Sequence, residues 1–285
     1  MNNKIIIAID AMGGENAPFK NISGVSLFLK KNKKKDDVFF NLYGNEDLIK
    51  KELSKYNIST DKYKIFSSST VVSDEETPLT AIKNSKDSSM WNSINSQIIS
   101  NSNITLSAGN TGVLFVVSRM LLKTIETVSK PALAGLWPNQ KNMNVVLDLG
   151  ANVDCNEENL IDFSEMGAAL YKALFPDDVP KVALLNIGSE EIKGTESLKK
   201  AHAKLKEISK YGDFEFNGFI EGDKITHGNS NVIVTDGFTG NIALKTAEGT
   251  AKFITDSLKQ SLTSNIFAKI SVIFSYFALK KFKDK

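Results

Sequence analysis

The sequence has 285 residues, of which 41% are hydrophobic and 24% are charged, and its net charge is +2. These values are ordinary for a globular protein with a sizeable core, and the nearly balanced charge gives no support to nucleic-acid binding. The single cysteine, Cys155, excludes an internal disulfide bond and predicts a cytoplasmic protein. No run of about 18 apolar residues predicts a membrane-spanning helix, and the apolar run at the N-terminus is too short for a signal peptide.

The first part of the chain is expected to alternate between strands and helices. Residues 4–9 are continuously apolar, as is typical of a buried parallel strand, and Asp10, Gly13 and Gly14 follow in a loop. This loop either binds a ligand or is a plain turn. Further strands are expected at residues 38–44, 63–66 and 104–106, helices at residues 21–33 and 47–56, and a loop or edge strand at residues 67–73.

A polar stretch at residues 83–89 contains Lys86, Asp87 and Ser88. Aspartate and serine are favoured N-cap residues, so this stretch can begin a helix. A lysine beside serines can also hold a phosphate, and the sequence alone leaves both interpretations open.

Residues 107–112, with the sequence SAGNTG, are the central feature of the chain. They join the strand at residues 104–106 to an apolar helical segment at residues 113–122. A glycine-rich turn at this point directs backbone N–H groups toward a ligand, and the helix N-terminus adds positive potential. The device recurs after a strand at residues 232–234, where Gly237, Thr239 and Gly240 match Gly109, Thr111 and Gly112 in order. The repetition favours an anion site over an ordinary turn.

Between the two glycine loops, three more strands each end in polar residues. A strand at residues 144–148 leads into Asp148 and Asn152, one at residues 181–187 leads into the polar loop 188–194, and one at residues 214–220 leads into Glu221. Helices are expected at residues 158–175 and 196–211, the second with an i,i+4 pair between Glu196 and Lys200.

This alternation predicts an α/β fold with a mostly parallel sheet flanked by helices. The carboxyl ends of parallel strands share one edge of a sheet, so the loops that follow them are expected to converge on one cleft, as in an enzyme. These loops begin at or near Asp10, Gly109, Asp148, Asn186, Glu221 and Asp236.

The expected cleft is rich in Gly, Asn, Thr, Ser and Asp and poor in His and Cys. It has no metal-ligand spacing and no G-x-G-x-x-G fingerprint, so neither a metal nor a nicotinamide cofactor is predicted. The residues alone indicate an enzyme that handles phosphate or acyl groups.

Seven motifs, taken together and in order, resemble those of the bacterial phosphate acyltransferase family of phospholipid synthesis. They are IDAMGG at residues 9–14, KDSSM at 86–90, SAGNTG at 107–112, LDLGANVDC at 147–155, LNIG with EE and KG at 185–194, GFIEG at 218–222 and TDGFTGN at 235–241. The resemblance covers residues 5–250 and implies a three-layer fold like that of isocitrate and isopropylmalate dehydrogenases. It also implies a homodimer without a cofactor.

The resemblance implies transfer of a fatty acyl group from acyl carrier protein to inorganic phosphate, which gives an acyl phosphate for a membrane acyltransferase. We expect two loops to bind the phosphate and the oxyanion through backbone N–H groups and threonine hydroxyls. Lys193 and Lys86 would add charge, and Asp236 and Asn186 would orient the nucleophile. The loop residues are Gly109, Asn110, Thr111, Gly112, Thr239, Gly240 and Asn241, and the other expected binding residues are Asp10, Gly13, Gly14, Ser88, Asp148 and Asn152. Asn110, Asn186, Lys193 and Asp236 are the expected catalytic residues.

The C-terminal part, residues 258–285, is expected to be a separate amphipathic helical segment after a catalytic domain at residues 1–257. Its apolar residues recur at helical spacing, and it contains Lys269, Lys280, Lys281, Lys283 and Lys285. Such a helix either lies on a membrane surface or packs on the core or a partner. The resemblance favours the membrane surface, and it also implies a further glycine-rich segment with a histidine, which would follow Lys285.

Two alternative functions remain. One is a truncated homologue that binds carrier protein or membrane without efficient catalysis. The other is a decarboxylating dehydrogenase of the same fold, which would require an arginine cluster, whereas Arg119 is the only arginine in the sequence.

Overall fold

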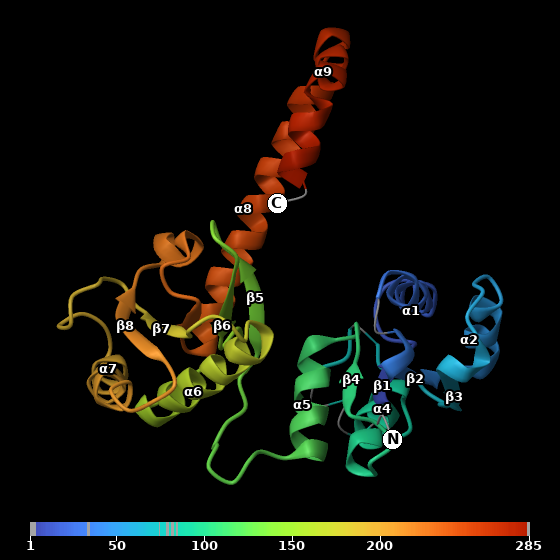
Figure 1. Cartoon of the computed structure of the whole chain (residues 1–285), viewed down its shortest axis with the longest axis horizontal. Helices are drawn as coiled ribbons and strands as arrows, with labels where there is room; N and C mark the ends of the chain where they lie inside the picture. Colours follow the sequence, from blue (N-terminus) through green and yellow to red (C-terminus); the bar gives the residue numbers. More distant parts are fainter. Residues whose placement is uncertain are drawn as a thin grey trace. The chain divides into compact units, whose positions relative to one another are not determined.

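The computed structural model describes residues 4–32, 35–73, 75–77, 80, 83 and 85–283. By its internal contacts the chain divides into two compact units, Met1–Pro131 and Ala132–Lys285. Each unit has its own sheet, and Figure 1 shows the elements of both.

The first unit is built on a four-stranded parallel sheet in the order β3-β2-β1-β4. Its strands are β1 (Ile5–Asp10), β2 (Val38–Gly44), β3 (Tyr63–Ser67) and β4 (Ile104–Leu106), and its helices are α1 (Phe19–Lys31), α2 (Glu46–Leu53), α4 (Ser89–Ile98) and α5 (Thr111–Leu122). Short 3₁₀ helices at Lys35–Asp37 and Thr60–Lys62 precede β2 and β3.

The two faces of this sheet are covered by different helices because successive side chains of a strand point to opposite sides. Ile9 and Leu42 pack with residues of α1 and α2 such as Ile22 and Ile49. On the other face, the Thr105 hydroxyl donates a hydrogen bond of 2.9 Å to the carbonyl oxygen of Ser93 in α4.

The second unit has a five-stranded sheet in the order β5-β6-β9-β7-β8, parallel except for β5 against β6. Its strands are β5 (Ala134–Pro138), β6 (Met143–Leu147), β7 (Lys181–Leu185), β8 (Glu215–Ile220) and β9 (Val232–Val234), and a 3₁₀ helix spans Gly222–His227. Helices α6 (Glu157–Leu174) and α7 (Glu196–Ile208) pack on one face through residues such as Phe163 and Leu205. Leu244 of helix α8 (Gly237–Thr263) packs on the other.

Helix α8 extends beyond the sheet, and α9 (Ile266–Lys283) turns back beside it (Figure 1). The helical segment expected from residue 258 thus consists of the end of α8 and of α9, which are separated at Ser264 and Asn265. Among the described helices, none is alone long and apolar enough to cross a membrane. Residues 237–263 and 266–281 meet that test only as a pair, which is bent by 113°.

The predicted α/β class with a mostly parallel sheet flanked by helices is confirmed, but the expectation of one sheet edge is wrong. The strands divide between two sheets, so the loops after β1 and β4 belong to a different edge from those after β6, β7, β8 and β9. Strand β5 was not predicted. It pairs with β6 across a short turn at residues 139–142. Its residues alternate between exposed and half-buried positions, but five residues are too few for such an alternation to predict a strand from the sequence.

Two smaller predictions also differ from the structure. The helix expected at residues 21–33 begins at Phe19 and ends at Lys31, and residue 33 lies outside the described part of the chain. The Glu196–Lys200 pair is wrong. Lys199 pairs with Glu196 at 3.2 Å, whereas Lys200 lies 3.9 Å from Glu157 in α6.

His202 of α7 is buried against two rings of β8. Its ring centroid lies 5.2 Å from that of Phe216 and 4.6 Å from that of Phe219. Burial lowers the pKa of His202, because the charged imidazolium loses its hydration.

We expect the free energy of unfolding to be fully retained above the ordinary histidine pKa of about 6.5 and to decrease as the pH falls below it, since the unfolded chain binds the proton more tightly. The variant His202→Phe should have a weaker pH dependence between about pH 7.5 and about pH 5.5 in urea unfolding. His227→Asn, at an exposed position, is the control. An unchanged pH dependence in His202→Phe would contradict this role.

Candidate functional site

The loops after β1 and β4 meet around a buried carboxylate in the first unit. Asp10 is 1% exposed, and its Oδ2 accepts a hydrogen bond of 2.7 Å from the Ser107 hydroxyl. The Ser107 oxygen in turn accepts one of 3.1 Å from the Gly109 N–H. Asn21 of α1 fixes the first loop by donating to the carbonyl oxygens of residues 10, 11 and 13.

Glycines allow these two loops to approach each other closely. A Cβ atom on Gly13 would collide with Asp10 Oδ2 and lie 2.9 Å from the Gly109 nitrogen. Gly14 has φ +87° and lies against the carbonyl of Ala108. The loop–loop contact expected from the motifs is therefore present, and any side chain at residue 13 would separate the loops.

The second carboxylate oxygen of Asp10, Oδ1, is buried without a hydrogen-bond partner among the described residues. A buried carboxylate oxygen that lacks a partner costs free energy, so such an atom often marks a place where a ligand or water completes the hydrogen bonding.

Helix α5 begins directly after this contact. The Asn110 side chain caps it by accepting a hydrogen bond of 3.1 Å from the Val113 N–H, and its amide donates one of 3.1 Å to the carbonyl of Glu76. Thr111 and Gly112 form the first turn, where backbone N–H groups have no acceptor within the helix. These N–H groups, rather than the Asn110 side chain, are the donors that the geometry offers to an anion.

Ser88 and Lys86 lie in different surroundings before α4. Ser88 is buried and caps α4 by accepting a hydrogen bond of 3.1 Å from the Trp91 N–H, which confirms the helix-start interpretation of that stretch. Lys86 is exposed in the turn before this cap.

A second buried carboxylate, Asp148, organises the carboxyl edge of the other sheet. It is 0% exposed. Its two oxygens accept five hydrogen bonds of 2.8–3.1 Å, from the backbone N–H groups of Leu133, Gly150, Ala151 and Asn152 and from the Asn152 amide. With its acceptor sites used by the protein, Asp148 shapes the loop and is not available to a substrate.

The start of α8 packs tightly on this loop. The Gly237 N–H donates a hydrogen bond of 2.8 Å to the carbonyl of Asn152, and the Asn241 amide donates one of 3.2 Å to the carbonyl of Leu149. A Cβ on Gly240 would collide with the carbonyl oxygen of Asp148. Gly240 and Asn241 thus join α8 to the Asp148 loop, whereas we expected them to bind phosphate.

Asp236 is the N-cap of α8. Its carboxylate accepts hydrogen bonds of 2.8 Å from both the N–H and the hydroxyl of Thr239. The two G-x-T-G sequences are consequently not equivalent in structure: Gly109 precedes the cap of its helix, whereas Gly237 follows the cap. Each helix begins directly after an Asn or Asp whose side chain accepts a hydrogen bond from the N–H three residues later. This N-cap residue determines the first residue of the helix more strongly than the glycines do.

The loop after β7 contains Asn186 and Lys193. Asn186 is buried, donates a hydrogen bond of 3.1 Å to the carbonyl of Lys193 and accepts one of 2.9 Å from the Ile187 N–H, so it holds the loop closed. The Lys193 ammonium lies 2.9 Å from Glu190, and this hydrogen bond raises the pKa of Lys193. Lys193 is therefore a half-exposed cation at this edge.

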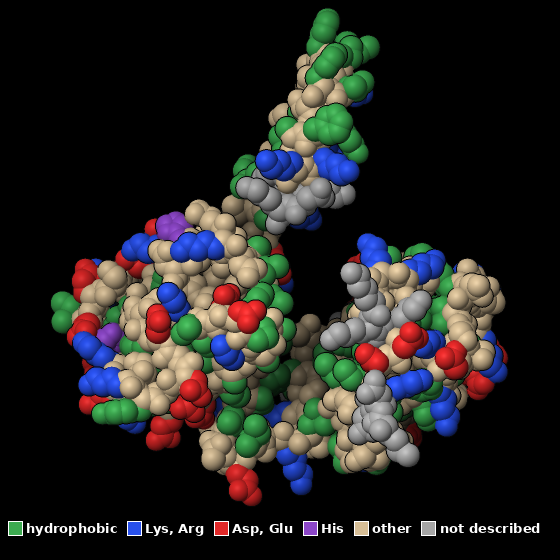
Figure 2. Space-filling model, in the orientation of Figure 1, with side chains coloured by type: hydrophobic (Ala, Val, Ile, Leu, Met, Phe, Trp, Pro, Cys, Tyr) green, Lys and Arg blue, Asp and Glu red, His purple; other side chains and the backbone are tan. Residues whose placement is uncertain are grey.

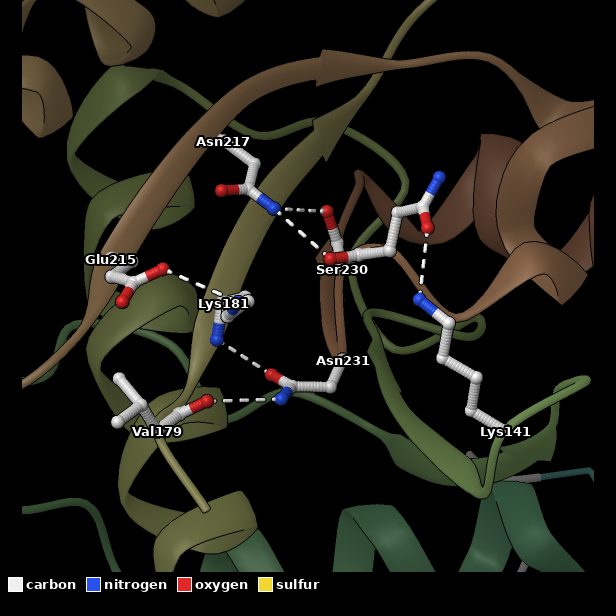
Figure 3. Close-up of polar contacts among 8 residues, drawn as sticks. Lys141, Val179, Lys181, Glu215, Asn217, Ser230 and Asn231 are labelled. Carbon is white, nitrogen blue, oxygen red and sulfur yellow. Dashed lines mark hydrogen bonds and ion pairs between the residues drawn. The ribbon is translucent and has the colours of Figure 1, made fainter.

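Polar contacts join the strands at the opposite, amino-terminal edge of the second sheet (Figure 3). Asn231 joins the chain before β7 to the start of β9, accepting from the Lys181 N–H at 2.6 Å and donating to the Val179 carbonyl at 3.0 Å. Glu215 lies 3.6 Å from the Lys181 ammonium. Together with Lys141, Asp178 and Asn229, these residues line a pocket of about 430 Å³.

The structure thus brings the expected residues together in two groups, with Asp10, Gly13, Gly14 and Gly109 in one unit and Asp148, Asn152, Gly240 and Asn241 in the other. Ser107 belongs to the central stretch at residues 107–112 but was not among the expected site residues, and neither was Asn21 of α1. Among the described residues, no group of three or more His, Cys, Asp or Glu side chains could hold a metal ion.

The close contact at Gly240 generates a stability prediction. Gly240→Ala should lower the free energy of unfolding by about 1–3 kcal/mol, because its methyl group must displace backbone and not a flexible side chain. Gly249→Ala, in the same helix with no atom within 4 Å, should raise it by about 0.5–1 kcal/mol. Urea unfolding of both variants tests the contact, and equal stability of the two would contradict it.

Comparison with known proteins places the chain in a family. The family model described as "Fatty acid synthesis protein" matches residues 5–285. The phosphate acyltransferase of Pelagibacter ubique (strain HTCC1062) is 50% identical over 285 residues, which cover 100% of this chain and 84% of that protein. The phosphate acyltransferase of Caulobacter vibrioides is 37% identical, again over 100% of this chain, and over 78% of that protein.

Solved structures of similar fold include two phosphotransacetylases. The EutD phosphotransacetylase from Staphylococcus aureus has a TM-score of 0.60 at 14% identity and covers 88% of this chain and 83% of its own. The phosphotransacetylase from Streptococcus pyogenes has a TM-score of 0.62 at 14% identity, with coverage of 87% and 82%. These likenesses concern the fold alone, and the expected likeness to isocitrate and isopropylmalate dehydrogenases stays a prediction. The full-length sequence matches show that the chain belongs to the fatty acid synthesis protein family, that of the bacterial phosphate acyltransferases, and that it is an acyltransferase.

Proposed function

We propose that the chain transfers a fatty acyl group from acyl carrier protein to inorganic phosphate and releases an acyl phosphate for phospholipid synthesis. The observation that carries this proposal is the capped N-terminus of α5 beside the buried Asp10–Ser107–Gly109 contact. A helix N-terminus preceded by a glycine loop suits a phosphate, because its N–H groups and its dipole both favour an anion. Family membership supplies the acyl group as the second reactant.

In the proposed reaction, a phosphate oxygen attacks the carbonyl carbon of the thioester and forms a new C–O bond. The C–S bond then breaks, and the thiolate of the carrier's pantetheine arm leaves with the electron pair. A thiol has an ordinary pKa of about 8.5, so the leaving group needs little help from a general acid. The protein's tasks are to hold the phosphate against the thioester and to stabilise the oxyanion that forms on the carbonyl.

The residues take different parts in this proposal from those first expected. The first-turn N–H groups at Thr111 and Gly112 bind the phosphate, and Asn110 positions them as the cap. At the other sheet, Lys193, which pairs with Glu190, and the first turn of α8, which Asp236 caps, lie at the ends of the neighbouring strands β7 and β9.

The assay is the release of carrier thiol and the formation of acyl phosphate from palmitoyl-acyl carrier protein and phosphate, without added metal or nucleotide. We expect phosphate-dependent release with the unaltered chain. Asn110→Ala should reduce turnover at least tenfold and also cost about 1 kcal/mol of stability, since it removes the cap. Asn110→Ser keeps a capping oxygen and should retain most of the turnover.

The outcomes distinguish the possible roles. If Asn110→Ser is as impaired as Asn110→Ala, the amide contacts the reacting groups directly and the cap interpretation is wrong. If the folded, unaltered chain binds carrier protein but releases no thiol, the proposed transfer is wrong and the alternative of a non-catalytic binding protein replaces it.

We also propose that the protein acts as a homodimer. In addition, we propose that α8 and α9 attach it to the surface of a membrane, where a membrane acyltransferase would use the acyl phosphate. Large apolar side chains of these helices are exposed, among them Phe274 and Phe277 at 83% each. Figure 2 shows hydrophobic side chains gathered at the outer part of the helix pair, with lysines nearby. Lys269, Lys280 and Lys281 are exposed, while the side chains of Lys283 and Lys285 lie outside the described part.

Vesicles that contain anionic lipid should co-sediment with the protein. The double variant Phe274→Glu and Phe277→Glu should bind at least tenfold more weakly, because burial of each phenylalanine is worth about 1.5–3 kcal/mol. Tyr211→Glu, at a residue that is 93% exposed elsewhere in the same unit, is the matched control. Equal binding by the double variant and the control would show that these helices serve another purpose, such as contact between two copies.

A further inference from the structure

A cavity of about 400 Å³ lies between α1 and the β4 side of the first sheet. Its walls are mainly apolar: Ile7 and Ile9 come from β1, Phe40 from β2, Leu106 from β4, and Gly24, Val25 and Phe28 from α1. Leu106 is 48% exposed. Its size and lining are those of a small-molecule site.

The cavity is polar at one end and apolar at the other. Lys20 and Asn21, in the first turn of α1, lie at the same end as Ser107 and Ala108, which directly follow β4. Phe28, two turns further along α1, lies about 10 Å from this end, given the rise of 1.5 Å per residue. The polar end includes Ser107 and Ala108, which lead into α5, where the proposed function places the phosphate, so the apolar end leads away from the reacting groups.

The hydrogen-bonding side chains at the polar end are already engaged. The Asn21 amide donates to loop carbonyls, the Ser107 hydroxyl donates to Asp10, and Lys20 pairs with Glu15 at 3.5 Å. An extended peptide segment in this cavity would bury amide groups with few side-chain partners, which is unfavourable, whereas a hydrocarbon chain needs none. The apolar lining therefore suits an acyl chain.

We propose that this cavity, the acyl groove, holds the hydrocarbon chain of the acyl donor, with the thioester carbonyl at the Ser107–Gly109 end and the tail toward Phe28. The inference rests on the proposed function for the identity of the donor. A length of about 10 Å accepts roughly eight carbons of an extended chain, given C–C bonds of about 1.5 Å. The groove thus makes the enzyme selective for medium and long acyl chains over short ones.

Gly24 provides a clean way to fill the groove. A Cβ atom built on it meets no atom within 4 Å, so a larger side chain can enter the open space without moving the helix. The leucine side chain of Gly24→Leu should occupy part of the groove. Gly24→Ala is the control, because it also raises the helix propensity but adds only a methyl group.

The test measures the binding of palmitoyl-pantetheine and butyryl-pantetheine by calorimetry, together with acyl phosphate formation from the corresponding carrier thioesters. We expect Gly24→Leu to weaken palmitoyl binding and to raise its KM at least tenfold, with little change for butyryl, since each excluded methylene costs about fourfold in affinity. Gly24→Ala should behave as the unaltered chain does. Leu106→Phe narrows the groove from the opposite wall and should reproduce the effect if Gly24→Leu does not fold.

Three results would overturn the inference. The first is equal palmitoyl binding by the folded Gly24→Leu and Gly24→Ala proteins, and the second is an equal loss of palmitoyl and butyryl binding in Gly24→Leu. The third is no palmitoyl binding by the unaltered chain, which would mean that polypeptide covers the groove instead. Palmitoyl binding that is sensitive to Gly24→Leu, without any acyl phosphate formation, would support the groove and refute the proposed reaction. If Gly24→Leu forms acyl phosphate with the same chain-length preference as the unaltered chain, the proposed reaction is supported and the groove is refuted.

Discussion

The fold of this acyltransferase depends on buried carboxylates at the ends of strands, which hold the following loops by accepting hydrogen bonds. Asp148 is the fullest example, since five donors from the loops around β6 converge on its two oxygens. A buried carboxylate is stable only when it is well hydrogen-bonded, so the surrounding backbone must adopt the conformation that supplies those donors. Asp10 has a similar position after β1 but keeps one oxygen without a partner among the described residues.

This constraint explains why so few of the polar side chains in the motifs are available to a substrate. Asn186, Asn241 and Asp236 are all engaged in hydrogen bonds that close their own loops or cap their helix. The groups that remain available are the backbone N–H groups in the first turns of α5 and α8. Backbone N–H groups suit the binding of an anion, because these donors are fixed by the fold and do not titrate.

The acyl groove connects this anion site to the apolar side of the first unit. The two share Ser107 and Ala108, so the head of an acyl chain and the phosphate would meet at the loop after β4. The same short strand therefore provides both the apolar wall at Leu106 and the glycine turn that follows it. A long acyl chain bound there would gain affinity from burial while its carbonyl stays beside the helix N-terminus.

The sequence by itself determined the local elements, because apolar runs, glycine loops and capping residues act over a few neighbours. It predicted the strands at β1 and β9, the helix that starts near Thr111, and the family through seven ordered motifs. Only the tertiary structure decided how the strands divide between two sheets, because pairing depends on contacts between distant residues such as Val145 with Val232. It also decided that Asp148 and Asn241 serve the loops, since a side chain's partner is set by packing and not by its position in a motif.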